Sequence, residues 1–485
     1  MTQDNIKRSL LAYFSFLLLC CFVLSPYRDT FYYWEWSRHL ALSYYDGPPL
    51  IAYAIRAFTS VFGTSLFALN LVGLLSVALS SFFIYKITEL LADKKTAWLA
   101  AALWFTAPFV NQELLARVTY DNLLNLFWVS SLYYLVRYIR FQKSLDCYKF
   151  ACSAGLMLLS KYTGLVLLMA VLVFFISQPK LRGIFKTKQF YLAIIIILLM
   201  LSPIFIWNIQ HDWLSIKYQM NIHQMGVIGY ANNVIVHQPA AINFGQHIIN
   251  ALHYLKSLVL NFNILLIIAI VGLAKSRMTR PLALDCLIGI AVVFIVFWTL
   301  ASALANVAAN YTMPLFSLIT IIAAYYLAQF KRGYLVKLII GIFLLIDVIA
   351  SISHIEGLSI NTRELNYNLA KQANMLYLKN PQPIITPHYV AAEQIGFWLS
   401  GRPQIYALSC GLGANQYEFW QQDFMAKLTQ HQVKQALFLD YMNEPYCIQP
   451  YFKQCTELPT ITMQKQAPFN HRVSEAKLYV YRCSN

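Results

Sequence analysis

Charge is what this sequence has least of. Aspartate, glutamate, lysine and arginine make up 12% of its 485 residues, whereas a soluble globular protein carries about 25%. Hydrophobic residues make up 59%, and the mean hydropathy is +0.52. These values exclude an ordinary soluble domain and predict a polytopic α-helical membrane protein.

Motifs of soluble nucleotide chemistry are also missing. The sequence contains no P-loop and no Rossmann-type glycine motif. It shows no internal repeat of about 20–50 residues and no low-complexity segment. Without a nucleotide-binding domain, an energy-coupled pump is disfavoured.

The nine cysteines form no CxxC pair, and we find no clear metal-ligand motif. The sequence therefore predicts no metal-binding residue, although it leaves open whether a divalent metal takes part. Five cysteines lie in or beside apolar segments and are interpreted as small apolar residues. The other four follow the last apolar segment, so one or two disulfides are expected there, with three possible pairings: Cys410, Cys447, Cys455 and Cys483.

The first apolar stretch lacks a small-residue cleavage site before Asp29, so we expect it to remain as a membrane anchor. A span needs about 20 apolar residues, and fewer inside a bundle. On this basis we predict about eleven transmembrane helices, at roughly residues 9–26, 66–88, 96–112, 121–137, 148–160, 162–178, 190–208, 252–274, 281–304, 312–330 and 334–354.

Basic residues are unevenly distributed over this frame. With the N-terminus inside, nineteen lysines and arginines fall in inside loops and at inside span ends. Seven fall outside: Arg28, Arg38, Arg56, Arg117, Lys161, Lys217 and Lys256. The positive-inside rule then fixes the orientation and places the C-terminal tail outside. The net charge of +16 therefore reflects membrane topology, and we expect no nucleic-acid partner.

Two parts follow from these patterns. Residues 1–354 form the transmembrane domain, and its first outside loop, 27–65, has the spacing of one or two interfacial helices broken at Pro48 and Pro49. Residues 355–485 are more polar, and short apolar runs alternate with amphipathic segments. This pattern predicts a small C-terminal extracytoplasmic α/β domain.

Polar residues gather at the outside ends of the predicted spans. Carboxylates can accept a proton from a hydroxyl group, arginine and lysine can hold phosphate, and aromatic rings can stack on a sugar. The candidates are Asp29 as the catalytic residue and Tyr33, Glu113, Arg117, Asp121, Lys161, Asn208 and His211 as substrate-binding residues. Two alternatives stay open. Glu113, Arg117 and Asp121, spaced for one helical face, are also compatible with a surface ion network, and Lys161 with a side chain that only snorkels to the interface.

Four segments resemble motifs of one enzyme family: DTFYYWEWS with YYDGPPL at 29–37 and 44–50, TYDNLL at 119–124, LLSKYTG at 158–164 and SPIFIWNIQHDW at 202–213. The family is the GT-C class of membrane glycosyltransferases. The branch consists of bacterial relatives of the dolichyl-phosphate-mannose–protein mannosyltransferases and includes the aminoarabinose transferases of lipid A. A weaker match lies at 415–420.

This resemblance implies a bacterial inner-membrane enzyme that takes a sugar from a polyprenyl-phosphate donor at the outer face. It would pass the sugar to a glycolipid such as lipid A, to a glycan or to a protein. The first-loop aspartate, here Asp29, would be the base. Asp121 and Lys161 match motif positions, and we infer from their chemistry that Asp121 positions acceptor or donor and that Lys161 meets the donor phosphate. The chain departs from the family in two places, because Thr30 stands where a glutamate is common and Gly47 where a histidine is common. These departures put the acceptor in doubt.

Three other functions compete with a transferase acting on an envelope glycolipid. A protein O-mannosyltransferase shares the chemistry. A lipid or glycan transporter would carry ionisable residues near the membrane midplane, whereas here they gather at span ends. A receptor that only displays its tail domain would need neither Lys161 nor the first-loop acid.

Overall fold

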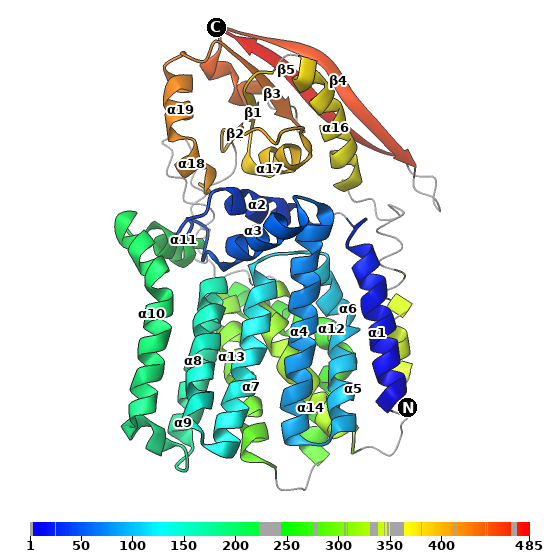
Figure 1. The fold of residues 1–485 in the computed structure, drawn as a ribbon, viewed down its shortest axis with the longest axis vertical. Coiled ribbons are helices and arrows are strands. Elements are labelled where there is room, and N and C mark those ends of the chain that lie inside the picture. Colours follow the sequence, from blue (N-terminus) through cyan, green and yellow to red (C-terminus); the bar gives the residue numbers. More distant parts are fainter. Residues whose placement is uncertain are drawn as a thin grey trace.

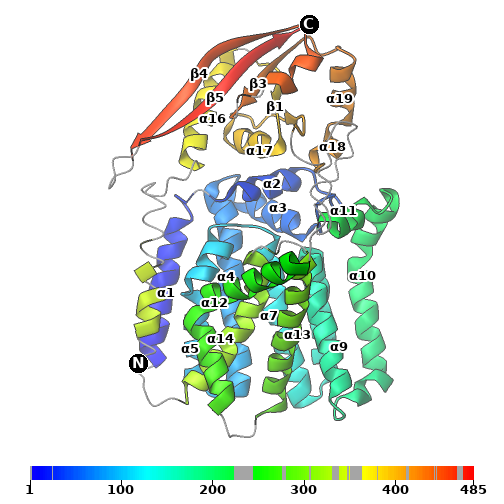
Figure 2. The same ribbon diagram turned by 180° about the vertical axis from the view of Figure 1, so that it is seen from behind.

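The computed structural model describes residues 3–24, 26–222, 244–275, 280–304, 307, 309–329, 338–343, 345, 346, 349, 363–379, 381–410, 414–441, 443, 445–466 and 473–485. A bundle of long helices carries two short helices across one end, and the C-terminal region (residues 363–485) lies beyond them (Figures 1 and 2). The bundle helices are α1 (Gln3–Cys20), α4 (Leu66–Leu91), α5 (Lys94–Phe105), α7 (Tyr120–Phe141), α8 (Ser144–Ser160), α9 (Leu165–Ser177), α10 (Lys188–Gln210), α12 (Phe244–Lys275), α13 (Leu282–Leu304) and α14 (Met313–Leu327).

Ten of the eleven predicted spans coincide with these helices. The eleventh, 334–354, lies largely outside the described residues. Within the described part of the chain, four helices are long and apolar enough to cross a membrane alone, and a bent pair within α12 gives a fifth if it is counted as one span. Others are shorter: the 13 residues of α9 rise only about 20 Å, against a hydrocarbon core of ~30 Å. The chain is a multi-pass membrane protein, and the figure of eleven spans stays a prediction.

The first long loop forms the two helices expected of it. These are α2 (Arg28–Arg38) and α3 (Leu50–Phe62), and they lie across the end of the bundle (Figure 1). The break between them extends from His39 to Pro49, so α2 ends well before the proline pair, and the prolines directly precede α3. Almost every side chain of α2 is buried, including those of Trp34 and Trp36, which are 2% and 0% exposed. Helix α2 is therefore covered on both sides, by the bundle end and by the C-terminal region.

The C-terminal region contains a mixed sheet with the strand order β2-β1-β3-β5-β4. Its elements are α16 (Arg363–Lys379), β1 (Ile384–Thr386), α17 (Tyr389–Trp398), β2 (Ile405–Ala407), α18 (Tyr417–Trp420), α19 (Gln422–Thr429), β3 (Gln435–Asp440), β4 (Gln454–Gln466) and β5 (Val473–Ser484). Strand β1 pairs in parallel with β2 and β3, whereas β5 pairs antiparallel with β3 and β4. The α/β pattern is present, and the boundary predicted at residue 354 falls outside the described residues.

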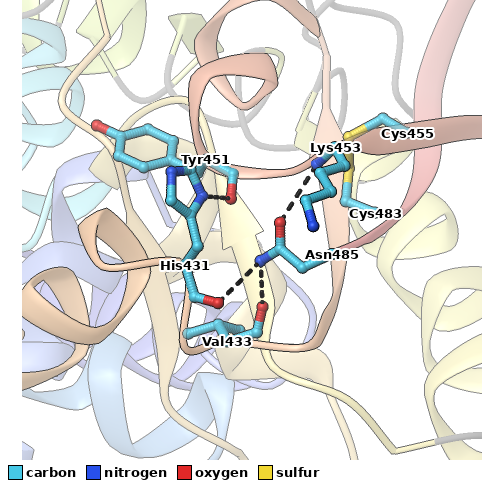
Figure 3. The surroundings of a disulfide bond; sticks show 7 residues. All are labelled: His431, Val433, Tyr451, Lys453, Cys455, Cys483 and Asn485. Carbon is cyan, nitrogen blue, oxygen red and sulfur yellow. Dashed lines mark hydrogen bonds between the residues drawn. A yellow bond between two sulfur atoms is a disulfide. The ribbon is translucent and has the colours of Figure 1, made fainter.

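Two disulfides close this region. They join Cys410 to Cys447 and Cys455 to Cys483. The second links the paired strands β4 and β5 beside Asn485, whose side chain donates to the carbonyl oxygen of Val433 at 2.8 Å and accepts from the backbone amide of Lys453 at 3.3 Å (Figure 3). Of the three possible pairings, the structure therefore has the one that joins successive cysteines in the chain. The second disulfide ties the end of β5 to the start of β4.

The C-terminal region contacts α2 through aromatic side chains. Phe397 of α17 lies 5.0 Å, centroid to centroid, from both Phe31 and Trp34. Tyr389, at the start of α17, lies 4.7 Å from Tyr32. Because these contacts join residues more than 350 positions apart, the helix that carries Asp29 is held from above by the end of the chain.

Candidate functional site

Helices α2 and α3 cover one end of the bundle (Figure 1), and a buried ion pair joins the chain near the starts of α7 and α9. Lys161, in the turn between α8 and α9, donates from Nζ to Oδ1 of Asp121 at 2.7 Å. Asn310 Nδ2 donates to the other carboxylate oxygen at 2.8 Å. Lys161 and Asp121 are 6% and 3% exposed. The structure therefore joins two predicted site residues directly, and Lys161 does not snorkel to the surface.

Tyrosine rings surround the lysine end of this pair. The ammonium lies 4.5 Å from the ring centroid of Tyr120 and 4.2 Å from that of Tyr311, distances at which a cation is attracted to an aromatic face. Tyr33 packs edge-on against Tyr120 at 5.2 Å. Burial disfavours the charged ammonium, but the Asp121 carboxylate outweighs that effect and holds the pKa of Lys161 above its ordinary value. The lysine is therefore a fixed positive charge.

Local sequence explains the position of Asp121. Thr119 precedes α7, and its hydroxyl accepts a hydrogen bond from the Asp121 amide at 3.2 Å. Asn122 completes a capping box by accepting from the Thr119 amide at 2.8 Å. A carboxylate in the first turn also faces the positive end of the helix dipole. Helix α7 thus starts anew at Tyr120 and delivers Asp121 to the bundle end.

This restart makes one prediction wrong. Glu113, Arg117 and Asp121 do not share a helical face, because Glu113 lies in a separate π-helix, Asn111–Leu115, and the chain is irregular between it and α7. The i,i+4 pair is still formed, with Arg117 Nη1 3.1 Å from Glu113 Oε2. Burial raises the pKa of the Glu113 carboxyl, and Arg117 opposes that shift. Glu113 is 5% exposed, so the pair is not an ordinary surface network.

Asp29 lies in the first turn of α2 and is the most accessible of the predicted acids. Its side chain is 46% exposed and lies 3.5 Å from Arg28 Nε. The charges of Asp29 and Asp121 both act on the hydroxyl of Tyr33, whose pKa is raised mainly by burial. Tyr33 is therefore close enough to both Asp29 and Asp121 to feel the charge of each. The Asp29 carboxylate is therefore open to an acceptor hydroxyl without a change in the fold.

Thr30, which replaces the glutamate expected from the family resemblance, is fully buried. Its hydroxyl accepts a hydrogen bond from the Val118 amide at 3.2 Å. The side chain thus fastens α2 to the segment before α7. No carboxylate is supplied at this position of the described chain.

Asn208 lies in the last turn of α10 and His211 directly follows that helix, before α11 (Leu214–Ile222). The Asn208 side chain is a hydrogen-bond partner of Tyr162, the residue after Lys161. Asn208 Oδ1 accepts from the Ile216 amide at 3.3 Å. The His211 ring stacks on Trp207 at 4.0 Å, and its Nδ1 lies 2.8 Å from the Trp207 carbonyl oxygen. These contacts shape the turn, and a substrate-binding role for either residue stays a prediction.

Asp46 is an acid that the sequence reasoning quoted within a motif but did not choose. Its carboxylate accepts a hydrogen bond from the Tyr32 hydroxyl of α2, and its carbonyl oxygen accepts from Gln219 Nε2 of α11 at 2.7 Å. The preceding residue, Tyr45, donates its backbone amide to Gln416 Oε1 of the C-terminal region at 2.7 Å. Burial raises the pKa of Asp46 to about 7, against the effect of its hydrogen bonds. The sequence feature that points to Asp46 is its place in the YYDGPP motif.

An apolar groove of about 730 Å³ runs along the bundle from this site. Tyr162 and Gln219 are among its lining residues, and α9, α10 and α13 supply most of the others: Leu165, Val166, Met169, Leu201, Ile204, Phe205, Phe297, Trp298, Ala301 and Leu304. Its size and composition suit a hydrocarbon chain. Among the described residues, no three histidine, cysteine or acidic side chains are arranged to hold a metal ion.

The chain resembles known proteins in sequence and in fold. A family model described as dolichyl-phosphate-mannose-protein mannosyltransferase matches residues 46–207. A lipid A galacturonosyltransferase, RgtD of Rhizobium johnstonii, is 25% identical over 202 residues, which span 41% of this chain and 42% of that relative. The crystal structure of ArnT from Cupriavidus metallidurans bound to undecaprenyl phosphate superposes with a TM-score of 0.68 at 12% identity, covering 98% of each chain. The apo form of ArnT gives 0.66.

The matched part of the sequence includes Asp46, Asp121 and Lys161, and the fold likeness extends over nearly the whole chain. The chain therefore has the fold of ArnT, and part of its sequence is similar to the dolichyl-phosphate-mannose-protein mannosyltransferase model and to a lipid A galacturonosyltransferase.

Proposed function

We propose that this protein transfers a sugar from a polyprenyl-phosphate donor to an envelope glycolipid, of the lipid A type, at the outer face of a bacterial inner membrane. One observation carries the proposal. An accessible acid, Asp29, and a fixed cation, Lys161, lie at the same end of the bundle, and Tyr162, the residue after Lys161, lines an apolar groove of about 730 Å³. A lipid phosphate whose tail lies in that groove brings its head group to this end.

The same proposal includes the membrane topology. About eleven spans place the N-terminus in the cytoplasm, and they place the site and the C-terminal domain on the extracytoplasmic side. The excess of basic residues in the inside loops supports this orientation. The two disulfides support it as well, because disulfides persist in oxidising compartments.

In the proposed reaction, Asp29 accepts the proton of the acceptor hydroxyl as the hydroxyl oxygen forms a bond to the anomeric carbon. The bond between that carbon and the donor phosphate oxygen breaks on the opposite face, and its electron pair stays on that oxygen, so lipid phosphate leaves. The exposure of the Asp29 side chain supports this role. The donor bond supplies the driving force, so no nucleotide is needed.

Lys161 contributes positive charge where the leaving phosphate becomes more negative. Because Asp121 fixes its position, and Asn310 in turn holds the Asp121 carboxylate, it acts as a preorganised charge and needs no rearrangement during the reaction. Arg117, which is 35% exposed in its side chain and stacks over Tyr27 at 4.6 Å, is the second cation near this end. Glu113, Asp121 and Tyr33 shape the site around these charges.

Mass spectrometry of lipid A, envelope glycans and secreted proteins, with and without this chain, tests the proposal. We expect one sugar to disappear from a glycolipid when the chain is deleted and to return on complementation. Loss of a sugar from secreted proteins instead would favour a protein O-mannosyltransferase, which is the second candidate because of the family match over residues 46–207. No change in any class would favour a lipid or glycan transporter.

A further inference from the structure

Glu393 is a carboxyl group with no evident structural purpose. It lies on α17, is 1% exposed, and neither of its oxygens has a hydrogen-bond partner within the described part of the chain. Its helical neighbours four positions away, Tyr389 and Phe397, pack on α2. Glu393 therefore lies in the contact between the C-terminal region and the helix that carries Asp29.

A side chain of this kind costs stability. A buried polar group without a partner is destabilising relative to a paired one, and an unpaired ionised carboxylate is much more so. A methionine or leucine at the same position would avoid both costs. A residue that breaks the packing rule without compensation is expected to have a functional reason.

The groups that face Glu393 from α2 are mostly of its own sign. They are Asp29 and Glu35, with Arg28 as a partly exposed cation, and Asp46 of the following loop adds a further acid. The hydroxyls of Tyr389 and Tyr417 are also within electrostatic reach.

The other elements packed on α17 add little. Strands β1 and β2 carry no acidic or basic side chain. The described lysines of α16, Lys371 and Lys379, are exposed. Burial and the neighbouring acids together hold the pKa of Glu393 well above that of an ordinary glutamate.

We propose that Glu393 is a positioning residue which, as an uncharged carboxylic acid, allows α17 to dock on the helix of Asp29, and that ionisation of this one side chain separates the C-terminal region from α2. Ionised, it would place an unpaired negative charge in an apolar contact, beside Asp29 and Glu35. The state with α17 docked on α2 is then the protonated state. The link to catalysis rests on the proposed role of Asp29, whereas the docking itself does not.

Two consequences follow. Docking of α17 becomes less favourable as the pH rises from the pKa of an ordinary glutamate towards the raised pKa of docked Glu393, by about tenfold in the docking equilibrium per pH unit, since one proton is lost, and the effect levels off above the raised pKa. Transfer falls in the same range, because Asp29 loses the element that covers its helix. Both effects vanish when residue 393 cannot ionise.

Amide hydrogen exchange of the full chain in lipid nanodiscs tests the docking directly. Peptides covering α17 and α2 are followed from mildly acidic to alkaline pH in the wild type, in Glu393→Gln and in a control, Glu457→Gln, which removes an exposed glutamate from β4. The ratio of wild-type to Glu393→Gln exchange cancels the intrinsic pH dependence. We expect that ratio to rise in α17 peptides by about tenfold per pH unit above the pKa of an ordinary glutamate, and to level off above the raised pKa of docked Glu393. The control should follow the wild type.

A flat ratio across the pH series would overturn the proposal, whatever the activity. If Glu393→Gln does not fold, Glu393→Met serves in its place, since it is also uncharged and of similar length. The transfer rate is measured on the same samples. If docking follows the predicted pH dependence while transfer does not, the inference on Glu393 stands and the role proposed for Asp29 fails.

Discussion

At the scale of single residues, the site combines a buried ion pair, Lys161 with Asp121, and an accessible acid, Asp29, in the first turn of α2. The sequence identified Asp121 and Lys161 from motifs, yet it could not show that they form one ion pair, because they are 40 positions apart and on different helices. It also could not identify Asn310 as the third member. Such pairing is a property of helix packing, which no local pattern records.

The first prediction concerns this pair. Lys161→Met should destabilise the protein by about 3–5 kcal/mol, because it leaves the buried Asp121 carboxylate without its cation. Lys161→Met combined with Asp121→Asn should recover a large part of that loss. Thermal unfolding in detergent measures the effect, with Lys217→Met, an exposed lysine on α11, as the control. Unchanged stability in Lys161→Met would mean that the pair is not formed.

The second prediction concerns Asp46, whose pKa is raised to about 7. A carboxyl whose folded pKa exceeds its unfolded value stabilises the fold fully below the unfolded pKa, and that contribution is lost as the pH rises through about 7. Asp46→Asn cannot ionise. The wild type should therefore lose stability relative to Asp46→Asn as the pH rises from about 4 to about 7, and the difference should then level off.

Unfolding temperatures over a pH series check this, with Asp423→Asn as a control at an exposed position of α19. A constant difference between wild type and Asp46→Asn would contradict the assignment.

At the scale of elements, the length of an apolar run predicted well which segments are helical, but the sequence predicted poorly where each helix ends. Long apolar runs must become helices in a bilayer, because every backbone hydrogen bond has to be satisfied internally. The position at which a helix begins depends on capping. Thr119 and Asn122 cap the start of α7, so the single helical face expected for Glu113, Arg117 and Asp121 is not formed. The long strand β4 was not predicted, since its sequence lacks a clear apolar alternation.

The third prediction is on the disulfides of the C-terminal region. Replacing Cys410 and Cys447 by alanine should cost about 3–4 kcal/mol, because the closed loop spans 37 residues and its constraint on the unfolded chain is lost. Replacing Cys455 and Cys483, which are 28 residues apart, should cost a similar amount. Unfolding of the purified protein measures both. Cys152→Ala, at an exposed free cysteine of α8, is the control and should have no effect.

The fourth prediction is on the apolar groove. Ala301→Trp narrows it and should raise KM for a long-chain donor about tenfold, since excluding two methylene groups forfeits ~1.6 kcal/mol, while kcat changes little. A donor with a short chain should be much less affected. Ala328→Trp, at an exposed position after α14, is the control. Equal KM values for long and short donors in Ala301→Trp would show that the lipid lies elsewhere.

At the scale of the whole molecule, three distant parts of the chain meet around α2. The first loop, the segment around α11 and the C-terminal region are joined at Asp46, Gln219 and Gln416. A single sequence does not reveal contacts over 370 positions, such as Tyr45 to Gln416, so the cover over the site could not be predicted. The sequence did indicate that these parts lie on one side of the membrane, from the distribution of basic residues.

The central claim is that Asp29 is the base of a sugar transfer. It is tested most directly by measuring transfer from a labelled polyprenyl-phosphate sugar to glycolipid in proteoliposomes containing the wild type or Asp29→Asn. Loss of a positioned base should lower the rate by about 10²–10⁴-fold, with unchanged helix content and unfolding temperature. Full activity in a folded Asp29→Asn protein would contradict the account.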